Sequence, residues 1–297
     1  MSREEPLRTD GGEAAETAFS LVGNETRAEI LRVLGEDPWE PASFSDLRSA
    51  VDPDIDSGQF NYHLQQLVGV FVERTDEGYR LRSRGATLYR TLRAGTFTRS
   101  PDVAAFDAGF DCHFCGGRPE ARYGDGTFDL ECPDCGHLYT HSMAPPSTFE
   151  DVPTPEDLLD RVDSYTRHQV LAYARGVCPH CVTGLDVSLV DAEDVWTESA
   201  GDLTLFARYH CPHCDNRHFV SLGMALLSYP ALVAFCYERG LDVTSVPHWE
   251  LEFVATDRTV TVHSRDPWEV SLAVALEGDR LELVVDDSLE VVETHRE

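Results

Sequence analysis

Apolar residues in the first hundred positions recur every three to four residues, which is the period of a helix that buries one face. In the fourth such segment the buried face is expected to be Phe60, Leu64 and Leu67. Asn24 stands where a helix N-cap is expected, and Ser43 with Asp46 forms a capping-box pattern. The helices predicted from this pattern cover residues 13–22, 25–35, 43–50, 58–68 and 86–93.

Strict alternation of apolar and polar residues replaces the helical period in other segments, and it predicts strands. Residues 71–74 and 79–82 flank a Thr-Asp-Glu-Gly turn, which is typical of a β-hairpin. Beyond residue 100, strands are predicted at 185–190, 204–209, 249–254, 259–263, 270–276 and 281–285, with helices at 153–174 and 228–239. The fold class is therefore α+β with more than one domain.

Eight of the nine cysteines form four CxxC pairs. Two thiolates three positions apart on a tight turn reach one tetrahedral metal ion, and two such pairs complete a four-cysteine zinc site. Pairing neighbouring CxxC motifs closes the shorter loops, so we expect two structural Zn²⁺ ions per chain rather than pairing across the two sets. The expected ligands are Cys112, Cys115, Cys132 and Cys135 for one ion and Cys178, Cys181, Cys211 and Cys214 for the other.

Other interpretations of these cysteines remain open at this point. A CxxC motif is also a redox dithiol in some proteins, although four pairs in two sets favour structural metal. His113, His180 and His213 lie inside the motifs and are expected to be spacers, because four cysteines already fill a site. Cys236 is unpaired in an apolar segment and is expected in the core.

Composition changes the expected surroundings of the protein. The chain has 53 acidic residues and 24 basic ones, all of them arginine, for a net charge of −29. This balance predicts adaptation to a salt-rich cytoplasm, and an ordinary acidic protein is the alternative. We expect no signal peptide and no membrane span, because the most apolar stretch, 222–236, is too short to cross a bilayer. A cytoplasmic location also makes disulfides unexpected.

Two segments stand out from this acidity as candidate DNA contacts. Residues 57–72 hold no charged side chain, and amides there are suited to pairing with base edges. Residues 80–99 hold six arginines and no acid, which is suited to phosphate contacts from a hairpin. The candidate residues are Gln59, Asn61, Tyr62, His63, Gln66, Arg74, Arg80 and Arg82. A neutral packed helix face and a solvated basic hairpin are the alternatives.

The predicted order of helices and hairpin is that of a winged helix–turn–helix, and two motifs support it. The segment 19–31, FSLVGNETRAEIL, resembles the opening of ArsR-type repressors, and 60–67, FNYHLQQL, is similar to their recognition helix. The resemblance covers about residues 14–95. It implies a DNA-binding homodimer whose first and last helices, 13–22 and 86–93, form the interface. The cysteines of metal-sensing members are missing from 44–50, so sensing at that position is not expected.

These observations predict five parts of the chain. They are a disordered tail at 1–13, a winged helix–turn–helix DNA-binding domain at 14–100, a first zinc ribbon at 101–150, a linking helix at 151–175, and a second zinc ribbon packed with a C-terminal α+β domain at 176–297. The C-terminal domain is expected to be a small antiparallel sheet covered by a helix. This layout is similar to predicted ArsR-like regulators of haloarchaea.

The sequence therefore predicts a transcriptional regulator that binds double-stranded DNA as a homodimer. We find no P-loop, GxGxxG, GxSxG or HExxH motif, and all-cysteine sites leave no open metal position, so an enzyme is not expected. Residues 101–297 hold 12 arginines and 36 acids, a balance of −24, which favours an effector or a protein partner there over DNA. An adaptor of the transcription machinery and a thiol or metal sensor remain the alternatives.

Overall fold

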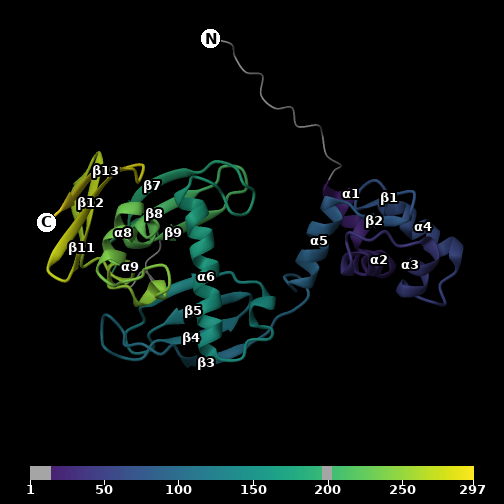
Figure 1. Ribbon diagram of the computed structural model, residues 1–297, viewed down its shortest axis with the longest axis horizontal. Helices are drawn as coiled ribbons and strands as arrows, with labels where there is room; N and C mark the ends of the chain where they lie inside the picture. The colour runs from purple at the N-terminus through teal and green to yellow at the C-terminus, as the bar shows by residue number, and fades with distance from the viewer. Residues whose placement is uncertain (1–14, 196–202) are drawn as a thin grey trace, which may run out of the picture. The chain divides into compact units, whose positions relative to one another are not determined.

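The structure, a computed structural model, describes residues 15–195 and 203–297. It divides into two compact units, Met1–Arg99 and Ser100–Glu297, each with its own colour range in Figure 1. The protein is mixed α+β with several small antiparallel sheets, as the sequence predicts. The tail predicted at 1–13 lies outside the described residues. In the part of the chain that is described, no helix is long and apolar enough to cross a membrane.

The first unit consists of helices that are capped by side chains and one short hairpin. Asn24, Ser43 and Asp56 each accept a backbone N–H at the start of a helix, at distances of 3.2, 3.2 and 2.8 Å. The elements are α1 (Ala15–Val22), α2 (Glu25–Glu36), α3 (Phe44–Val51), α4 (Ser57–Leu67), β1 (Val72–Arg74), β2 (Tyr79–Leu81) and α5 (Ser83–Arg93).

One apolar core holds the first unit together. Ile30 and Leu31 of α2, Leu47 of α3, and Phe60 and Leu64 of α4 are completely buried in it. These residues occupy the predicted helical spacing, so three helices each present one apolar face to the same interior. At the edge of this core the hairpin gains an extra backbone pairing to the segment before α3.

Helix α5 lies close to the rest of the first unit because two glycines leave room for it. A Cβ on Gly35 of α2 would be 2.2 Å from the ring of Tyr89 of α5. A Cβ on Gly85 of α5 would be 2.2 Å from the carbonyl oxygen of Phe71. Both distances are far inside van der Waals contact, so any larger residue would push α5 away from the core.

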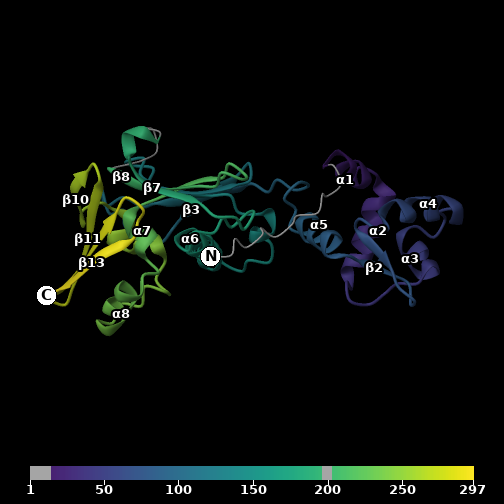
Figure 2. The same ribbon diagram turned by 90° about the horizontal axis from the view of Figure 1, so that it is seen from above.

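Within the described residues the second unit contains three antiparallel sheets, and in each of them the spatial order of the strands follows the chain. Every sheet is therefore built from consecutive strands (Figures 1 and 2). The first sheet is β3 (Val103–Asp107), β4 (Glu120–Gly124), β5 (Thr127–Glu131) and β6 (Leu138–Ser142). The second is β7 (Asp186–Asp191), β8 (Leu205–His210) and β9 (Arg217–Val220). The third is β10 (Val260–Arg265), β11 (Trp268–Leu276), β12 (Asp279–Asp286) and β13 (Val291–Arg296).

Helix α6 (Pro155–Ala174) joins the first two sheets, and Figure 1 shows it running from one to the other. Thr154 caps its start by accepting the backbone N–H of Asp157 at 3.2 Å. Leu158, Leu159 and Val162 in its first half are buried against the first sheet, whereas Tyr173 near its end is buried against the second. The predicted linking helix is therefore also the shared covering of both sheets.

The remaining helices in the described residues are η1 (Pro146–Phe149), η2 (Ala192–Asp194), α7 (Leu222–Leu226), α8 (Pro230–Glu238), η3 (His248–Glu250) and α9 (Glu252–Ala255). Phe149 of η1 and Trp249 of η3 pack against the first sheet, whereas residues of α7, α8 and α9 join the second and third sheets in one core. Cys236 of α8 is completely buried in this core, as expected, together with Leu205 of the second sheet and Val270 and Leu283 of the third. This largest core makes one body of the two sheets and α8.

The predicted strand at 249–254 is wrong. Trp249, Leu251 and Phe253 are buried and the glutamates between them are exposed, so burial does alternate as in a strand. The backbone nevertheless makes two short helical turns, in which the N–H groups of Val254 and Ala255 bond to the Leu251 carbonyl at 2.8 and 2.9 Å. Two turns that meet at an extended residue produce the same alternation as a strand. The pattern also failed to predict β3, β6, β9, α7 and β13.

Candidate functional site

The first cysteine cluster lies at one end of the first sheet, between two of its turns. Cys112 and Cys115 occupy the turn between β3 and β4, and Cys132 and Cys135 occupy the turn between β5 and β6. All four Sγ atoms lie within 4.8 Å of one another. The Sγ atoms of Cys112 and Cys135 are 3.7 Å apart, and those of Cys115 and Cys132 are 3.5 Å apart.

The second cluster repeats this arrangement on the second sheet. Cys178 and Cys181 lie between α6 and β7, and Cys211 and Cys214 lie between β8 and β9. Their Sγ atoms also lie within 4.8 Å of one another, with 3.7 Å between Cys178 and Cys214 and 3.4 Å between Cys181 and Cys211. The predicted pairing of neighbouring motifs is therefore confirmed for both clusters.

Both clusters match the geometry of a tetrahedral thiolate site. Zinc–sulfur bonds of about 2.3 Å at tetrahedral angles place sulfur atoms about 3.8 Å apart. The observed Sγ–Sγ separations of 3.4–3.7 Å agree with this value to within a few tenths of an ångström. Each cluster can thus hold one metal ion with four cysteine ligands, and such a site has no open coordination position for catalysis.

The four CxxC turns share one backbone hydrogen-bond pattern. The N–H group four residues after the first cysteine bonds to that cysteine's carbonyl at 2.8–2.9 Å in all four turns. This geometry places the residue after the second cysteine at positive φ, namely Gly116 and Gly136 in the first cluster, and Val182 and Asp215 in the second. The second cluster therefore holds two non-glycine residues in a conformation that L-amino acids adopt only at a cost.

Hydrogen bonds stabilise particular thiolates in each cluster. Burial opposes the ionisation of Cys112, but hydrogen bonds from the Tyr139 hydroxyl at 3.2 Å and from backbone N–H groups lower the pKa of Cys112 to about 6. The hydroxyl of Thr183, 3.2 Å from the Cys211 sulfur, is the largest cause that lowers the pKa of Cys211 to about 5. Both thiols are thereby prepared to bind a cation as thiolates.

The histidines inside the motifs are not among the clustered ligands. Within the described residues, both metal-ligating groups consist of cysteines alone. His113 instead places its Nε2 atom 3.1 Å from the carbonyl oxygen of Trp249. This contact joins the first cluster to the segment that contains η3, so His113 has a structural partner.

Helix α4 in the first unit presents an uncharged polar face to solvent. Gln59, Asn61, Tyr62 and Gln66 are exposed, and Tyr62 is 59% exposed. His63 differs from these four, because it is half-buried and its Nδ1 atom is buried without a hydrogen-bond partner. Burial and the nearby Arg27 charge lower the pKa of His63, so this histidine is neutral at neutral pH.

The three arginines predicted as phosphate contacts have different surroundings. Arg74 is exposed, and its guanidinium carbon lies 6.0 Å from the ring centre of Tyr79. Arg80 is held by Glu73 on the opposite strand, with 2.6 Å between the Arg80 Nε and the Glu73 carboxylate. Arg82 is exposed and donates to the carbonyl oxygen of Gly69.

The basic segment continues onto α5, which the sequence prediction did not single out residue by residue. Arg84, Arg90 and Arg93 are exposed, and none of their side chains forms an ion pair within the described residues. The signal that could have identified them is the run of six arginines without an acid, which extends past the hairpin to the end of this helix.

Comparisons with known families cover most of the chain. Residues 109–291 match the family described as Domain of unknown function (DUF7351). Residues 15–92 match the family described as Domain of unknown function (DUF7347). No curated protein and no solved structure matches the chain.

Proposed function

We propose that this chain, which belongs to the DUF7351 family, is a DNA-binding transcriptional regulator whose first unit is a winged helix–turn–helix. The observation that carries the proposal is the exposed face of α4. In a chain with 53 acidic residues, this face offers three glutamines, an asparagine and a tyrosine and no carboxylate. Glutamine and asparagine pair with adenine edges, and the absence of carboxylates avoids repulsion from phosphate.

The elements around α4 have the sequence order that this role requires. Helix α3, the turn that Asp56 ends, and α4 correspond to the helix–turn–helix, and the β1–β2 hairpin corresponds to the wing. The resemblance of residues 14–95 to ArsR-type repressors supports the same assignment. On this proposal Asn61 and Tyr62 contact base edges, and Arg74 and Arg82 contact the DNA backbone.

The surroundings of Arg80 refine this assignment. Its guanidinium is held by Glu73, which reduces its attraction for phosphate. Arg84, Arg90 and Arg93 have no such partner among the described residues, and we infer that they supply phosphate contacts or a positive electrostatic potential in its place. In a salt-rich cytoplasm the screening length is only about 3 Å, so these local charges act independently of the net charge of −29.

Exposed aromatic residues favour the proposed homodimer. Phe19 of α1 and Phe97, shortly after α5, are each 75% exposed. Phe19 lies on α1 and Phe97 lies close to the end of α5, and the family resemblance places these two helices at the dimer interface. Burial of two large rings from each chain would provide the apolar centre of such an interface.

We propose that both cysteine clusters hold Zn²⁺ in a structural role. Four thiolates at tetrahedral spacing suit zinc, which prefers this geometry and has no redox chemistry. When bound, the ion supplies a cross-link between two turns that are distant in the chain. The cysteines of each cluster then fix the turns at one end of a sheet. The rest of the second unit can bind an effector or a protein partner.

Selection from random DNA tests the proposed function. The metal-loaded chain, in concentrated KCl, is incubated with a random double-stranded library, and the bound fraction is sequenced. We expect an enriched inverted repeat, and we expect Asn61→Ala with Tyr62→Ala to abolish the enrichment. Trp39→Ala is the matched control, because Trp39 is an 81% exposed aromatic of the same unit that lies outside α4.

The outcomes of this selection separate the candidate functions. Enrichment that survives the α4 substitutions would contradict the assignment of α4 as the recognition helix. No enrichment by the folded, metal-loaded chain would contradict DNA reading and favour the protein adaptor.

A thiol or metal sensor is a second candidate, and one observation favours it. Cys115, Cys135 and Cys214 are exposed at their clusters, where an oxidant can reach them. The test is treatment with mild peroxide, followed by measurement of released zinc and of DNA affinity. Loss of both together supports a sensor, whereas zinc that stays bound at peroxide concentrations tolerated by the fold argues against it.

A further inference from the structure

A cavity of about 580 Å³ lies inside the second unit. Its walls are the edge strands β6 and β9 of the first two sheets, the second half of α6, and the turns of η3 and α9. A volume of this size is typical of pockets for small molecules. None of the eight clustered cysteines lines it, although His180, which lies between Cys178 and Cys181, does.

The walls of the cavity have an unusual composition for this chain. No aspartate or glutamate is among the described residues that line it, although the chain holds 53 of them. The one guanidinium in the walls belongs to Arg217, and it is paired with Asp215 at 3.0 Å. Among the described residues, the walls therefore offer no carboxylate and no unpaired guanidinium to an ionic ligand, and their other groups are aromatic, aliphatic, hydroxyl, amide and imidazole.

Two polar groups in the walls have no hydrogen-bond partner among the described residues. They are the Thr166 hydroxyl of α6 and the Nε2 atom of His218 in β9, and both atoms are buried. Buried polar groups in proteins are normally paired, so each unpaired group is destabilising. A ligand with complementary groups would remove this cost for both residues.

His218 also forms part of a flat aromatic wall. Its ring stacks on the ring of Tyr173, with 4.6 Å between centroids and 12° between planes. The hydroxyl of Tyr173 is held by the side-chain amide of Asn216 at 2.5 Å, which fixes the ring. A planar ligand is the natural partner of such a wall, because aromatic rings favour offset stacking and edge-to-face contacts.

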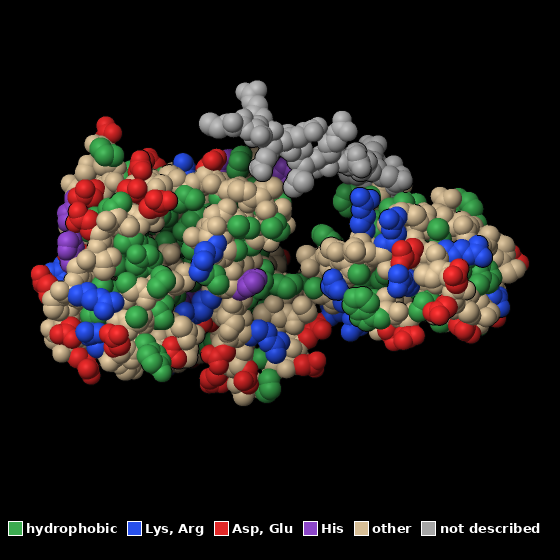
Figure 3. All heavy atoms as spheres, turned by 45° about the horizontal axis from the view of Figure 1, so that its top comes forward, with side chains coloured by type: hydrophobic (Ala, Val, Ile, Leu, Met, Phe, Trp, Pro, Cys, Tyr) green, Lys and Arg blue, Asp and Glu red, His purple; other side chains and the backbone are tan. Residues whose placement is uncertain are grey.

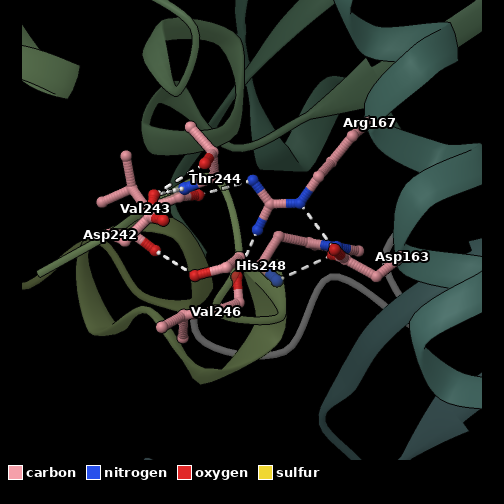
Figure 4. A network of polar contacts seen from close by, with 8 residues as sticks. Asp163, Arg167, Asp242, Val243, Thr244, Val246 and His248 are labelled. Carbon is pink, nitrogen blue, oxygen red and sulfur yellow. Dashed lines mark hydrogen bonds and ion pairs between the residues drawn. The ribbon is translucent and has the colours of Figure 1, made fainter.

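A buried network fixes a third polar group of the cavity, and Figure 4 shows it. The Nδ1 atom of His248 lies 2.5 Å from Asp163 Oδ1, and the His248 backbone N–H donates to the same oxygen at 2.9 Å. The other oxygen of Asp163 accepts from Arg167 Nε at 2.6 Å, and Arg167 also donates to the Val243 carbonyl at 2.7 Å. This network ties the loop before η3 to α6.

The network determines which atom of His248 is left for a ligand. The ion pair with Arg167 keeps Asp163 ionised, so Nδ1 of His248 carries the proton that it donates to the carboxylate. The remaining atom, Nε2, is then a hydrogen-bond acceptor, and His248 lines the cavity. Three histidine or carboxylate ligands do not come together here among the described residues, so Nε2 is an acceptor for a ligand N–H rather than part of a metal site.

We propose that this cavity binds a small, uncharged heteroaromatic molecule that carries a ring N–H donor and a ring acceptor. The N–H donates to His248, the acceptor pairs with the Thr166 hydroxyl or with His218, and the ring packs beside the Tyr173–His218 stack. The lack of free charge in the walls excludes carboxylates, phosphates and cations. The proposal does not depend on DNA binding, because every group in it lies in the second unit.

Binding of two uncharged probes and two charged controls to the full, metal-loaded chain tests the proposal. The probes are adenine and lumichrome, which are uncharged heteroaromatics with ring N–H groups. The controls are benzoate, an aromatic anion, and benzamidine, an aromatic cation. Saturation-transfer NMR detects binding, and calorimetry measures its affinity. We expect saturable binding of adenine or lumichrome, at least tenfold tighter than that of benzoate and benzamidine.

Two conservative variants connect the binding to the cavity. Thr166→Val removes only the hydroxyl, and His218→Phe keeps the stack on Tyr173 while removing the ring nitrogens. Because the acceptor pairs with one of these two groups, we expect at least one of the variants to weaken probe binding at least tenfold, with metal content unchanged in both. Thr148→Val is the matched control, because Thr148 is buried to the same extent, 8% exposed, but does not line the cavity.

The results that would overturn the proposal are distinct from failure to bind DNA. No saturable binding of either uncharged probe by the folded chain would overturn it. If both the Thr166→Val and the His218→Phe variants bound the probe as tightly as wild type does, the probe would lie elsewhere. If benzoate bound more tightly than the uncharged probes, an uncharged ligand would be contradicted.

Discussion

The two units of this protein are stabilised in different ways. Met1–Arg99 contains no cysteine, and one core formed by three helices and a hairpin holds it together. Ser100–Glu297 contains all nine cysteines, and in its described residues three small sheets share apolar cores with α6, α7, α8 and α9. A sheet of three or four short strands covers little apolar surface, and a metal cross-link in each cysteine cluster would compensate for this.

Charge follows the same division. Residues 1–100 hold 12 arginines and 17 acids, a balance of −5, whereas residues 101–297 have a balance of −24. Figure 3 shows acidic and arginine side chains on both units. The first unit is thus much less acidic than the second, and on our proposal it binds the anionic partner, whereas the cysteine clusters stabilise the second unit.

Removal of metal should produce the largest difference in stability between the two units. A chelator that strips both clusters should abolish the cooperative fold of the two cysteine-bearing sheets, because structural zinc contributes on the order of 10 kcal/mol to folding. The first unit should stay folded. Hydrogen exchange measured peptide by peptide reports both units in one sample. Retained protection of β4–β5 and β7–β8 without metal would contradict a structural role for the ions.

A core substitution in the first unit should destabilise that unit and leave the second unit folded. Phe60 is completely buried, so Phe60→Ala should cost the first unit about 3–5 kcal/mol and leave the second unit unchanged. The measurement is denaturant unfolding followed by hydrogen exchange in each unit. Tyr62→Ala, on the exposed face of the same helix, is the control and should cost far less. Simultaneous loss of both units would contradict their independence.

Acid should weaken the second unit through His218. Burial lowers the pKa of His218 to about 4, from its ordinary value of 6.5. Between these values the unfolded chain binds the proton and the folded chain does not, so stability is complete above about pH 6.5 and falls as the pH is lowered. From about pH 7 to 5, wild type should lose about 1–2 kcal/mol more than His218→Phe.

The comparison with His218→Phe isolates this histidine from the other acid-sensitive groups. Protonation of the cysteine ligands also weakens the second unit at low pH, and it does so equally in both proteins. Denaturant unfolding at matched pH and matched metal content measures the difference. Parallel pH profiles would contradict a buried, neutral His218.

The sequence predicted local features well and long-range contacts poorly. Helix α4 was expected at 58–68 and covers Ser57–Leu67, because its apolar period and its cap, Asp56, are both local signals. The cysteine clusters were predicted from spacing, since four thiolates around one ion leave few arrangements. The pairing of Glu73 with Arg80 follows from the hairpin register and could also have been predicted.

The cavity had no signal in the sequence. Asp163 and His248 are separated by 85 residues, and no pattern relates them. Asp163 and Thr166 lie on the buried side of α6 among apolar residues, where periodicity alone predicts only core. The walls also depend on β6 and β9, two edge strands too short to give a clear alternation.

The smallest predicted effect compares the two cysteine clusters with each other. Val182 occupies the positive-φ position of its turn at φ 62°, where the first cluster has glycine at Gly116 and Gly136. The left-handed conformation costs a β-branched residue about 1–2 kcal/mol, and a glycine at this position avoids that cost. Part of the stabilisation is lost again, because glycine has a larger conformational entropy in the unfolded state. Val182→Gly should therefore stabilise the second cluster by about 0.5–1 kcal/mol.

The converse substitution sharpens this test. A Cβ on Gly116 would meet no atom within 4 Å, so Gly116→Val changes only the backbone preference and should destabilise the first cluster by about 1–2 kcal/mol. Competition with a chromogenic chelator measures metal retention in both variants. If Val182→Gly retained metal less well than wild type, the valine would be stabilising its turn through contacts that outweigh its backbone strain, although its side chain is 77% exposed.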